Sequence, residues 1–342
     1  MKRIVAFLIV ICIVFMISTL ASAQTQVSAS SSQVTLSAKG GGDNPGSITV
    51  KPALSVGYLL NLGATEYTLT ARGAGIGGVT KRLYDYETSP AIYLAARLPF
   101  TYGRLETTLS GSWGIPAGSS DVKHKDFFGG ALLGGRTWEA ETNWVTGDVK
   151  ASYAIIKDFD FIKSVAPVVG VRYDYWKTKY DDPHKVSPGF GAAALTDKAD
   201  FYSSALLPYI GLTATIGGLK TGAFGGDLKL GAIGGWTVWG KVKHEEDRHG
   251  GGTLRFDEFK GDLRNSGYLF DFGEFFADYT VLSFAPSRRI QGSLSLFAKY
   301  NLFNAESKLD GTRTGTFNAQ DTFDFKIERS SAAVGICAAL VF

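Results

Sequence analysis

Asp247 and His249 are the two residues of this sequence whose types and spacing best suit a chemical role. They stand in the charged segment Lys243-His244-Glu245-Glu246-Asp247-Arg248-His249-Gly250. Because residues i and i+2 of an extended strand share a face, the carboxylate and the imidazole can reach each other. A carboxylate beside a histidine fixes its tautomer and stabilises its cation, which makes the ring a better general base. The competing interpretation is a solvated, charged loop tip.

A second segment, Asp121-Val122-Lys123-His124-Lys125-Asp126, repeats this spacing with His124 and Asp126. The four side chains together supply two imidazoles and two carboxylates, which could also bind a metal ion. No tight ligand spacing supports a metal site, so we expect no metal and no other cofactor. The sequence holds no phosphate-binding glycine loop with a lysine, no Gly-x-Ser-x-Gly motif and no catalytic cysteine.

The start of the chain predicts its export. Lys2 and Arg3 precede an apolar run over 4–20, and Ala21-Ser22-Ala23 is a small-residue cleavage site. Residues 1–23 therefore have the form of a secretory signal peptide rather than a membrane anchor, because no stop-transfer pattern follows. Residues 24–47 are rich in serine, glutamine and glycine, which predicts a flexible N-terminal arm.

Composition limits what the remaining chain can be. The 35 basic and 32 acidic residues nearly balance, and no basic patch indicates a nucleic-acid partner. Cys337 is the one cysteine outside the signal peptide, so no intramolecular disulfide is expected. After residue 23 no apolar stretch is long enough for a membrane helix. A chain of this kind can cross a membrane only as a closed β-barrel, because lipid offers no hydrogen bonds to open backbone groups.

From Ile48 onward the apolar residues repeat with a period of two. In the last stretch Ile336, Ala338, Leu340 and the terminal Phe342 fall on one face. Strands of bacterial barrels alternate in this way, and such a C-terminal strand is typical of substrates of the outer-membrane assembly machinery. A soluble β-sandwich is the competing interpretation. We predict an all-β fold, a ten-stranded antiparallel transmembrane β-barrel over 48–342, with strands at 48–70, 79–98, 103–116, 138–157, 161–179, 200–217, 222–245, 253–284, 290–306 and 320–342.

The connections of this barrel alternate between short turns and longer polar loops near 71–78, 117–137, 180–199, 246–252 and 307–319. Short turns are typical of the periplasmic side and long loops of the outside, so we expect both termini in the periplasm of a Gram-negative cell. Several strands exceed the about 9–11 residues that cross a membrane, which predicts an extracellular β-rim. The loops after strands three and seven lie on opposite walls, so the two His/Asp pairs could face each other across the mouth. Ten strands leave little free lumen, which disfavours a solute channel.

Several motifs resemble those of the omptins, a family of ten-stranded outer-membrane endopeptidases. The segments similar to omptin strands are Leu207-Pro208-Tyr209-Ile210-Gly211-Leu212 and Thr80-Lys81-Arg82-Leu83-Tyr84-Asp85-Tyr86, and Asp247-Arg248-His249 resembles their Asp-x-His dyad. The resemblance implies a surface endopeptidase in which His249, oriented by Asp247, takes a proton from the attacking water. Asp126 and His124 would hold that water from the opposite wall. Glu245 and Glu246 would favour basic peptide or protein substrates.

The sequence departs from the omptin pattern in the second loop. Omptins have two carboxylates where this chain has His124 and Asp126, so a non-catalytic barrel of omptin-like ancestry, an adhesin or a structural surface protein, is the alternative. The resemblance also implies outer-membrane lipids as partners and a requirement for lipopolysaccharide. Tyr173-Asp174-Tyr175-Trp176-Lys177 stands where omptins bind lipopolysaccharide, although the acidic member of their pattern is absent.

Overall fold

The computed structural model describes residues 34–37, 47–71, 81–86, 89–128, 131–186, 195–221, 224–250, 253–285, 290–314 and 319–342. The expected signal peptide, residues 1–23, and most of the expected arm, 24–47, lie outside this part of the chain. Within the arm segment, β1 (Val34–Ser37) pairs with β2 (Ser47–Val50). No helix of membrane-spanning length and apolar character occurs in the described ranges.

Antiparallel strands form one continuous sheet. We call each passage of the chain from one end of the barrel to the other a crossing, and each crossing pairs with the next. The last strand pairs with β3 along nearly its whole length, from Val341↔Ala53 to Phe323↔Ala71, and this pairing closes the barrel. The remaining strands are β3 (Ala53–Ala71), β4 (Lys81–Tyr86), β5 (Ser89–Tyr102), β6 (Leu105–Pro116), β7 (Ser120–Phe128), β8 (Ala131–Tyr153), β9 (Ile156–Phe159), β10 (Ile162–Val186), β11 (Leu195–Thr221), β12 (Phe224–Gly235), β13 (Trp239–Gly250), β14 (Thr253–Asp262), β15 (Arg264–Asn265), β16 (Phe272–Phe284), β17 (Gln291–Thr314) and β18 (Ala319–Val341).

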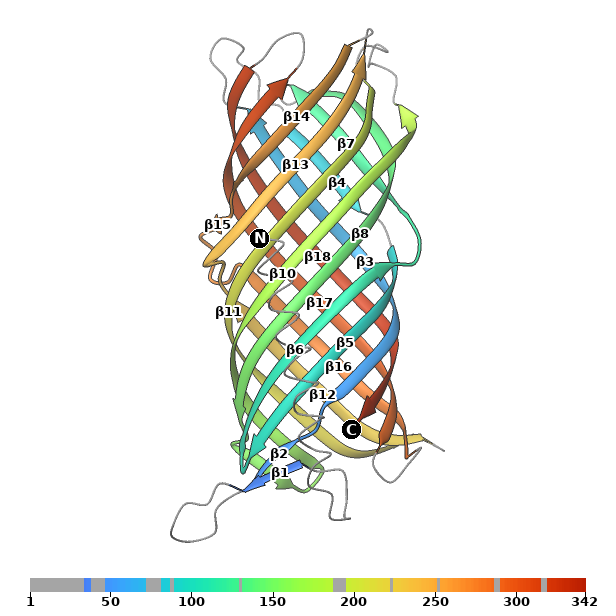
Figure 1. Ribbon diagram of the computed structural model, residues 1–342, viewed down its shortest axis with the longest axis vertical. Coiled ribbons are helices and arrows are strands. Elements are labelled where there is room, and N and C mark those ends of the chain that lie inside the picture. Colours follow the sequence, from blue (N-terminus) through green and yellow to red (C-terminus); the bar gives the residue numbers. More distant parts are fainter. Residues whose placement is uncertain are drawn as a thin grey trace.

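The strands make ten crossings, which confirms the predicted fold class. Six crossings are single long strands: β3, β8, β10, β11, β17 and β18. The other four are interrupted: β4 with β5, β6 with β7, β12 with β13, and β14 and β15 with β16. Figure 1 shows the tall barrel with β7, β13 and β14 at one end and the C-terminus at the other. We refer to these as the rim end and the short-turn end.

In the half of the barrel toward the short-turn end, side chains alternate along each strand between an apolar outer face and the lumen. Outward apolar side chains are 38–58% exposed in a belt around this half: Leu54, Val56, Ile92, Leu94, Val149, Val169, Val171, Ile210, Leu212, Leu296, Ile336 and Leu340. Their inward neighbours include small, polar and charged residues. This is the pattern of strands that face lipid on one side, because only the inner side can satisfy polar groups.

The structure corrects the expected long loops at the rim end. The segments 117–137, 180–199, 246–252 and 307–319 are largely strand, because β7 and β8, β10 and β11, β13 and β14, and β17 and β18 continue as paired hairpins. Strand pairing satisfies the backbone groups of these segments, so their polar sequences extend the wall as the predicted rim. At the short-turn end, the first turn falls at Gly103 and Arg104, rather than between the expected strands at 79–98 and 103–116.

Candidate functional site

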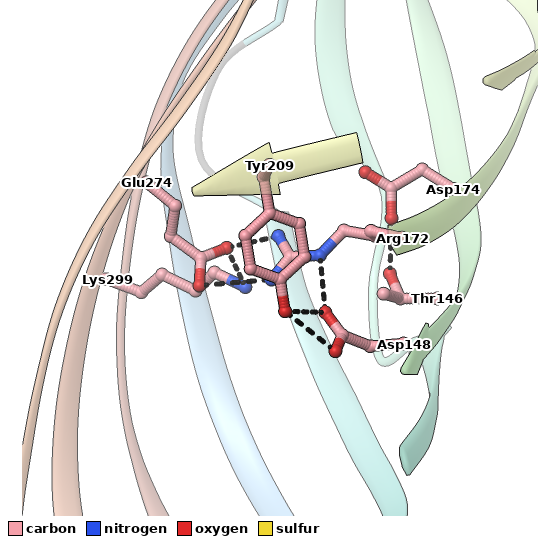
Figure 2. Close-up of polar contacts among 7 residues, drawn as sticks. All are labelled: Thr146, Asp148, Arg172, Asp174, Tyr209, Glu274 and Lys299. Carbon is pink, nitrogen blue, oxygen red and sulfur yellow. Dashed lines mark hydrogen bonds and ion pairs between the residues drawn. The ribbon is translucent and has the colours of Figure 1, made fainter. Parts of the chain in front are cut away.

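A network of buried charges crosses the lumen near the middle of the barrel (Figure 2). Arg172 of β10 donates from Nη1 to Glu274 Oε2 of β16 at 2.6 Å and from Nε to Asp148 Oδ2 of β8 at 3.3 Å. Lys299 Nζ of β17 reaches the same Glu274 Oε2 at 2.7 Å. The Tyr209 hydroxyl of β11 donates to Asp148 Oδ1 at 2.9 Å. The network therefore joins two walls of the barrel through side chains that are held on five strands.

Three charged side chains of this network are almost removed from solvent, whereas that of Lys299 is 36% exposed. Those of Arg172 and Asp148 are each 10% exposed and that of Glu274 is 6% exposed. The Arg172 guanidinium also lies 4.8 Å from the centre of the Phe272 ring. Charges this deep are tolerated only when each is paired and hydrogen-bonded, as here. Each charged group of this network is therefore matched by an oppositely charged partner.

Toward the rim, aromatic rings fill the lumen above the charges. Arg329 places its guanidinium 3.8 Å from the centre of the Trp176 ring. Beyond it, Phe201 lies 4.0 Å from Tyr67 and 6.2 Å from both Phe325 and His244, measured between ring centres. The buried His244 ring in turn stacks on Phe259, at 6.0 Å. We call this group, Tyr67, Phe201, His244, Phe259, Phe323 and Phe325, the aromatic layer. The charge network and the aromatic layer thus occupy successive levels of the lumen.

The backbone of the predicted catalytic residues lies at the rim end, beyond the aromatic layer. His124 and Asp126 belong to β7, where they pair with Arg136 and Gly134 of β8. Asp247 and His249 belong to β13, where they pair with Phe256 and Leu254 of β14. These two strands belong to the third and seventh crossings of the barrel, as expected from the sequence. The side chains of all four residues lie outside the described part of the structure.

Strand parity distinguishes the two pairs of positions. Neighbouring positions on a strand alternate between the two faces of a barrel wall. In β13, Val242 and His244 are buried in the lumen, whereas Lys243 and Glu245 are not, and positions 247 and 249 have the parity of the second pair. In β7, positions 124 and 126 pair with positions 136 and 134 of β8, which alternate on the same face as the buried Ala140. The register shift at this level, between Thr196 and Lys198, adds a residue to β11, whereas β13 pairs with β14 without a shift from Lys241 to Gly250.

The outer wall of the rim carries a polar cluster at the segment similar to the omptin lipopolysaccharide site. Lys177 Nζ lies 3.1 Å from Asp200 Oδ2 and 4.7 Å from the centre of the Tyr202 ring. The Tyr202 hydroxyl donates to the same Asp200 oxygen at 2.7 Å. Although partial burial lowers it, the pKa of Lys177 is raised overall by its hydrogen bonds to Tyr202 and Asp200. Lys177 of β10 is thus paired with an acidic group, Asp200, on the neighbouring strand β11.

Sequence reasoning did not find the charge network. In the sequence, these residues appear only as single charged positions within predicted strands, as Asp148 and Arg172 do. Their partners lie on other strands, so no local pattern identifies them. No group of three His, Cys, Asp or Glu side chains that could hold a metal occurs among the residues whose side chains are described. The four residues considered for a metal site are not among these residues.

Comparison with known proteins supports the fold. No protein-family model and no curated protein sequence matches this chain. The crystal structure of the outer membrane protease OmpT from Escherichia coli is similar over 85% of this chain and 97% of its own, with a TM-score of 0.54 and 9% identity. OccK1 (OpdK) from Pseudomonas aeruginosa aligns over 83% of this chain and 98% of its own with a TM-score of 0.14 and 9% identity, which supports no conclusion. The chain therefore has the β-barrel fold of an outer-membrane protein.

Proposed function

We propose that the chain is an outer-membrane endopeptidase that cleaves peptide bonds at the cell surface. The rim end faces the exterior, and the short turns and both termini face the periplasm. One observation carries the proposal: both His/Asp motifs lie at the same end of a barrel that resembles an outer-membrane protease over most of its length.

The proposed chemistry uses only side chains and water. Asp247 orients His249 and stabilises its cation, and His249 removes a proton from a water molecule as that water attacks the scissile carbonyl. Asp126 and a neutral His124 hold the water from the opposite wall. Because the charge network and the aromatic layer occupy the lumen beneath, the substrate enters and leaves through the mouth. Glu245 and Glu246 favour basic substrates. No metal or other cofactor takes part.

The outer cluster of Lys177, Asp200 and Tyr202 is the proposed contact for lipopolysaccharide. A lysine ammonium pairs with a lipid phosphate, and the tyrosine ring lies at the level where aromatic side chains meet headgroups. Binding there would stabilise β10 and β11, the strands next to β13, in the geometry that cleavage requires. The outer-membrane assembly machinery would insert the barrel through its C-terminal strand.

Strand parity favours a second candidate, a non-catalytic surface barrel that acts as an adhesin or structural protein. Positions 247 and 249 have the parity of Lys243 and Glu245, not that of the lumenal His244. A dyad on the outer face would be separated from positions 124 and 126 by the barrel wall. The endopeptidase therefore requires a local departure from this alternation in β13 that turns the dyad toward the mouth.

The decisive experiment is cleavage of a fluorogenic dibasic peptide by refolded protein, with and without lipopolysaccharide. We expect cleavage by the parent and a loss of about 10²–10⁴-fold in His249→Ala, because general base catalysis supplies about this factor. Asp247→Asn should lose most of the activity, and His124→Asp should raise it by restoring a second carboxylate. Lys163→Ala is the control, because Lys163 forms an exposed ion pair with Asp227 (2.7 Å) at the short-turn end.

The two candidates differ in outcome. A parent that is inert with lipopolysaccharide, and remains inert after His124→Asp, establishes the non-catalytic barrel. Barrel folding is monitored throughout by heat-dependent gel migration, so that an inactive variant is not mistaken for an unfolded one.

A further inference from the structure

The barrel wall carries a compact excursion between β14 and β16. It comprises residues 263–271, includes the two-residue strand β15, and lies beside the break between β12 and β13 at 236–238. Figure 1 shows it standing out sideways from the wall at about mid-height, near the label β15. Neither the charge network nor the proposed active site involves it.

Asp271 fixes the base of this excursion. Its side chain is almost fully buried, and Oδ2 accepts a hydrogen bond from the Thr237 backbone N at 2.8 Å. The other carboxylate oxygen accepts bonds from Ser266 N at 3.0 Å and Ser266 Oγ at 2.7 Å. The Asp271 backbone N donates to Gly235 O at 2.9 Å, and its carbonyl accepts from Asn304 N at 2.7 Å. These bonds tie the excursion to β12 and β17, so its shape is defined.

Aromatic packing holds the tip against the outer wall. Trp236 Nε1 donates to the Leu269 carbonyl at 2.9 Å, and the Trp236 and Phe270 ring centres are 5.2 Å apart. A Cβ on Gly234 would lie 3.0 Å from the Phe270 ring, so Phe270 covers a site on β12 that has no side chain. Of the other apolar side chains of the excursion, Leu263 is buried in the core, whereas Tyr268 and Leu269 are exposed.

The outer surface of the excursion is apolar and exposed. Leu269 is 80% exposed, Val238 62% and Tyr268 51%, and Trp239 adjoins them at 38%. Clustered exposure of this kind indicates an interaction surface rather than chance, because water-exposed apolar area is unfavourable. The cluster has a fixed backbone, so it is presented ready-made to whatever covers it.

Lipid is the occupant that the surroundings favour. Toward the short-turn end the cluster continues into the apolar belt through Ile210, Phe275 and Leu302, which are 36–56% exposed on neighbouring strands. Toward the rim it meets charge, because Lys326 Nζ lies 6.0 Å from the Tyr268 ring centre. The Lys326 pKa is raised by its hydrogen bond to Glu328, so this side chain stays cationic. Apolar tips, aromatic rings and cations in this order are typical of an element that lies in a membrane interface.

We propose that residues 263–271, together with Trp236–Trp239, form a lateral anchor in the outer leaflet. Leu269 and Val238 enter the acyl-chain boundary of the lipid at the rim side of the belt, and Lys326 remains at headgroup level. The anchor widens the membrane contact of the barrel on one side and fixes its depth in the bilayer. The proposal depends on the membrane-spanning barrel and not on peptide cleavage.

Depth-dependent fluorescence quenching tests this proposal. The full chain with Cys12→Ser and Cys337→Ser receives one cysteine at Leu269→Cys, is labelled with an environment-sensitive dye, and is inserted into phosphatidylcholine vesicles that contain doxyl-labelled lipid. Phe275→Cys, in the apolar belt, and Lys260→Cys, 65% exposed on the rim, are the matched reference positions. Insertion of each labelled variant is verified by heat-dependent gel migration before its quenching is measured.

We expect the Leu269 label to be quenched by doxyl lipid at least several-fold more than the Lys260 label, and to be protected from aqueous iodide. Asp271→Ala should return the Leu269 label to water while the Phe275 label stays quenched. Asp271→Asn should have a smaller effect, because it keeps an acceptor for Ser266 and loses only the acceptor for the Thr237 N–H. A Leu269 label that behaves like the Lys260 label overturns the lipid anchor, and the excursion would then be a surface for a protein partner.

Discussion

Removal of Arg172 from the lumen is the sharpest test of how the barrel is held together. The side chain makes hydrogen bonds to two carboxylates, at 3.3 Å to Asp148 and at 2.6 and 3.4 Å to Glu274. In Arg172→Met the stem is replaced by an apolar chain of similar length, and only the charged head is lost. Both carboxylates then remain buried with fewer partners.

The remaining partners set the size of the effect. Asp148 keeps the Tyr209 hydroxyl at 2.9 Å, and Glu274 keeps Lys299 at 2.7 Å. Neither carboxylate is left bare, so the loss should be that of a broken buried ion pair, about 3–5 kcal/mol in the free energy of unfolding. The Met side chain recovers little of this, because the attraction of the guanidinium to the Phe272 ring is lost as well.

The assay is urea unfolding of the refolded barrel in phospholipid vesicles, followed by tryptophan fluorescence. Lys163→Met is the matched control, because it removes an ion pair of similar length, 2.7 Å to Asp227, in which the side chains are 53% and 38% exposed. Exposed pairs of this kind contribute about 0–1 kcal/mol. We therefore expect a clear difference between the two variants.

A double variant provides a second test of the same explanation. Arg172→Met with Glu274→Leu removes both members of the pair, and buried pairs replaced together by apolar residues often cost little. Lys299, whose side chain is 36% exposed, can then reach water. We expect the double variant to regain part of the stability that Arg172→Met loses. The reasoning is refuted if Arg172→Met costs no more than Lys163→Met, or if the double variant is less stable than both single ones.

Three further predictions concern other parts of the molecule. Phe259→Ala should lower the free energy of unfolding by about 3–5 kcal/mol, because it opens a cavity beside Phe323, whose ring centre is 5.0 Å away, and this can be measured by the same urea unfolding. Gly211→Val should slow or block barrel assembly, since a Cβ there would lie 2.3 Å from the Ala232 carbonyl oxygen, and heat-dependent gel migration would report it. Lys177→Ala should weaken the stimulation of peptide cleavage by lipopolysaccharide several-fold without changing the folded fraction, which a titration of lipopolysaccharide in the cleavage assay measures.

The sequence alone determined the fold class. A period of two over 48–342 and the absence of a spanning apolar run leave only a closed barrel as a membrane-crossing structure. The alternation also located most strand positions, because the side-chain period of a strand is fixed by its geometry. The strand order also predicted that His124, Asp126, Asp247 and His249 lie at one end of the barrel, and the structure places their backbone there.

The lengths of the loops at the rim end could not be predicted from this alternation. Polar segments such as 117–137 and 307–319 look like loops in sequence, because a rim hairpin with water on its outer side needs no apolar face there. Backbone pairing, which leaves no trace in composition, decides that these segments are strands.

Tertiary structure alone decided what fills and surrounds the barrel. Arg172 and Glu274 are 102 positions apart, and no local pattern marks them as partners. The excursion at 263–271 likewise reads as part of one long strand, although it leaves the wall and is held there by Asp271 through atoms of Thr237 and Ser266. Local periodicity specifies a residue's face, whereas closure of the sheet and its register specify which residues meet across the lumen. For that reason the sequence predicts the barrel, and only the closed barrel reveals its charge network and the excursion at 263–271.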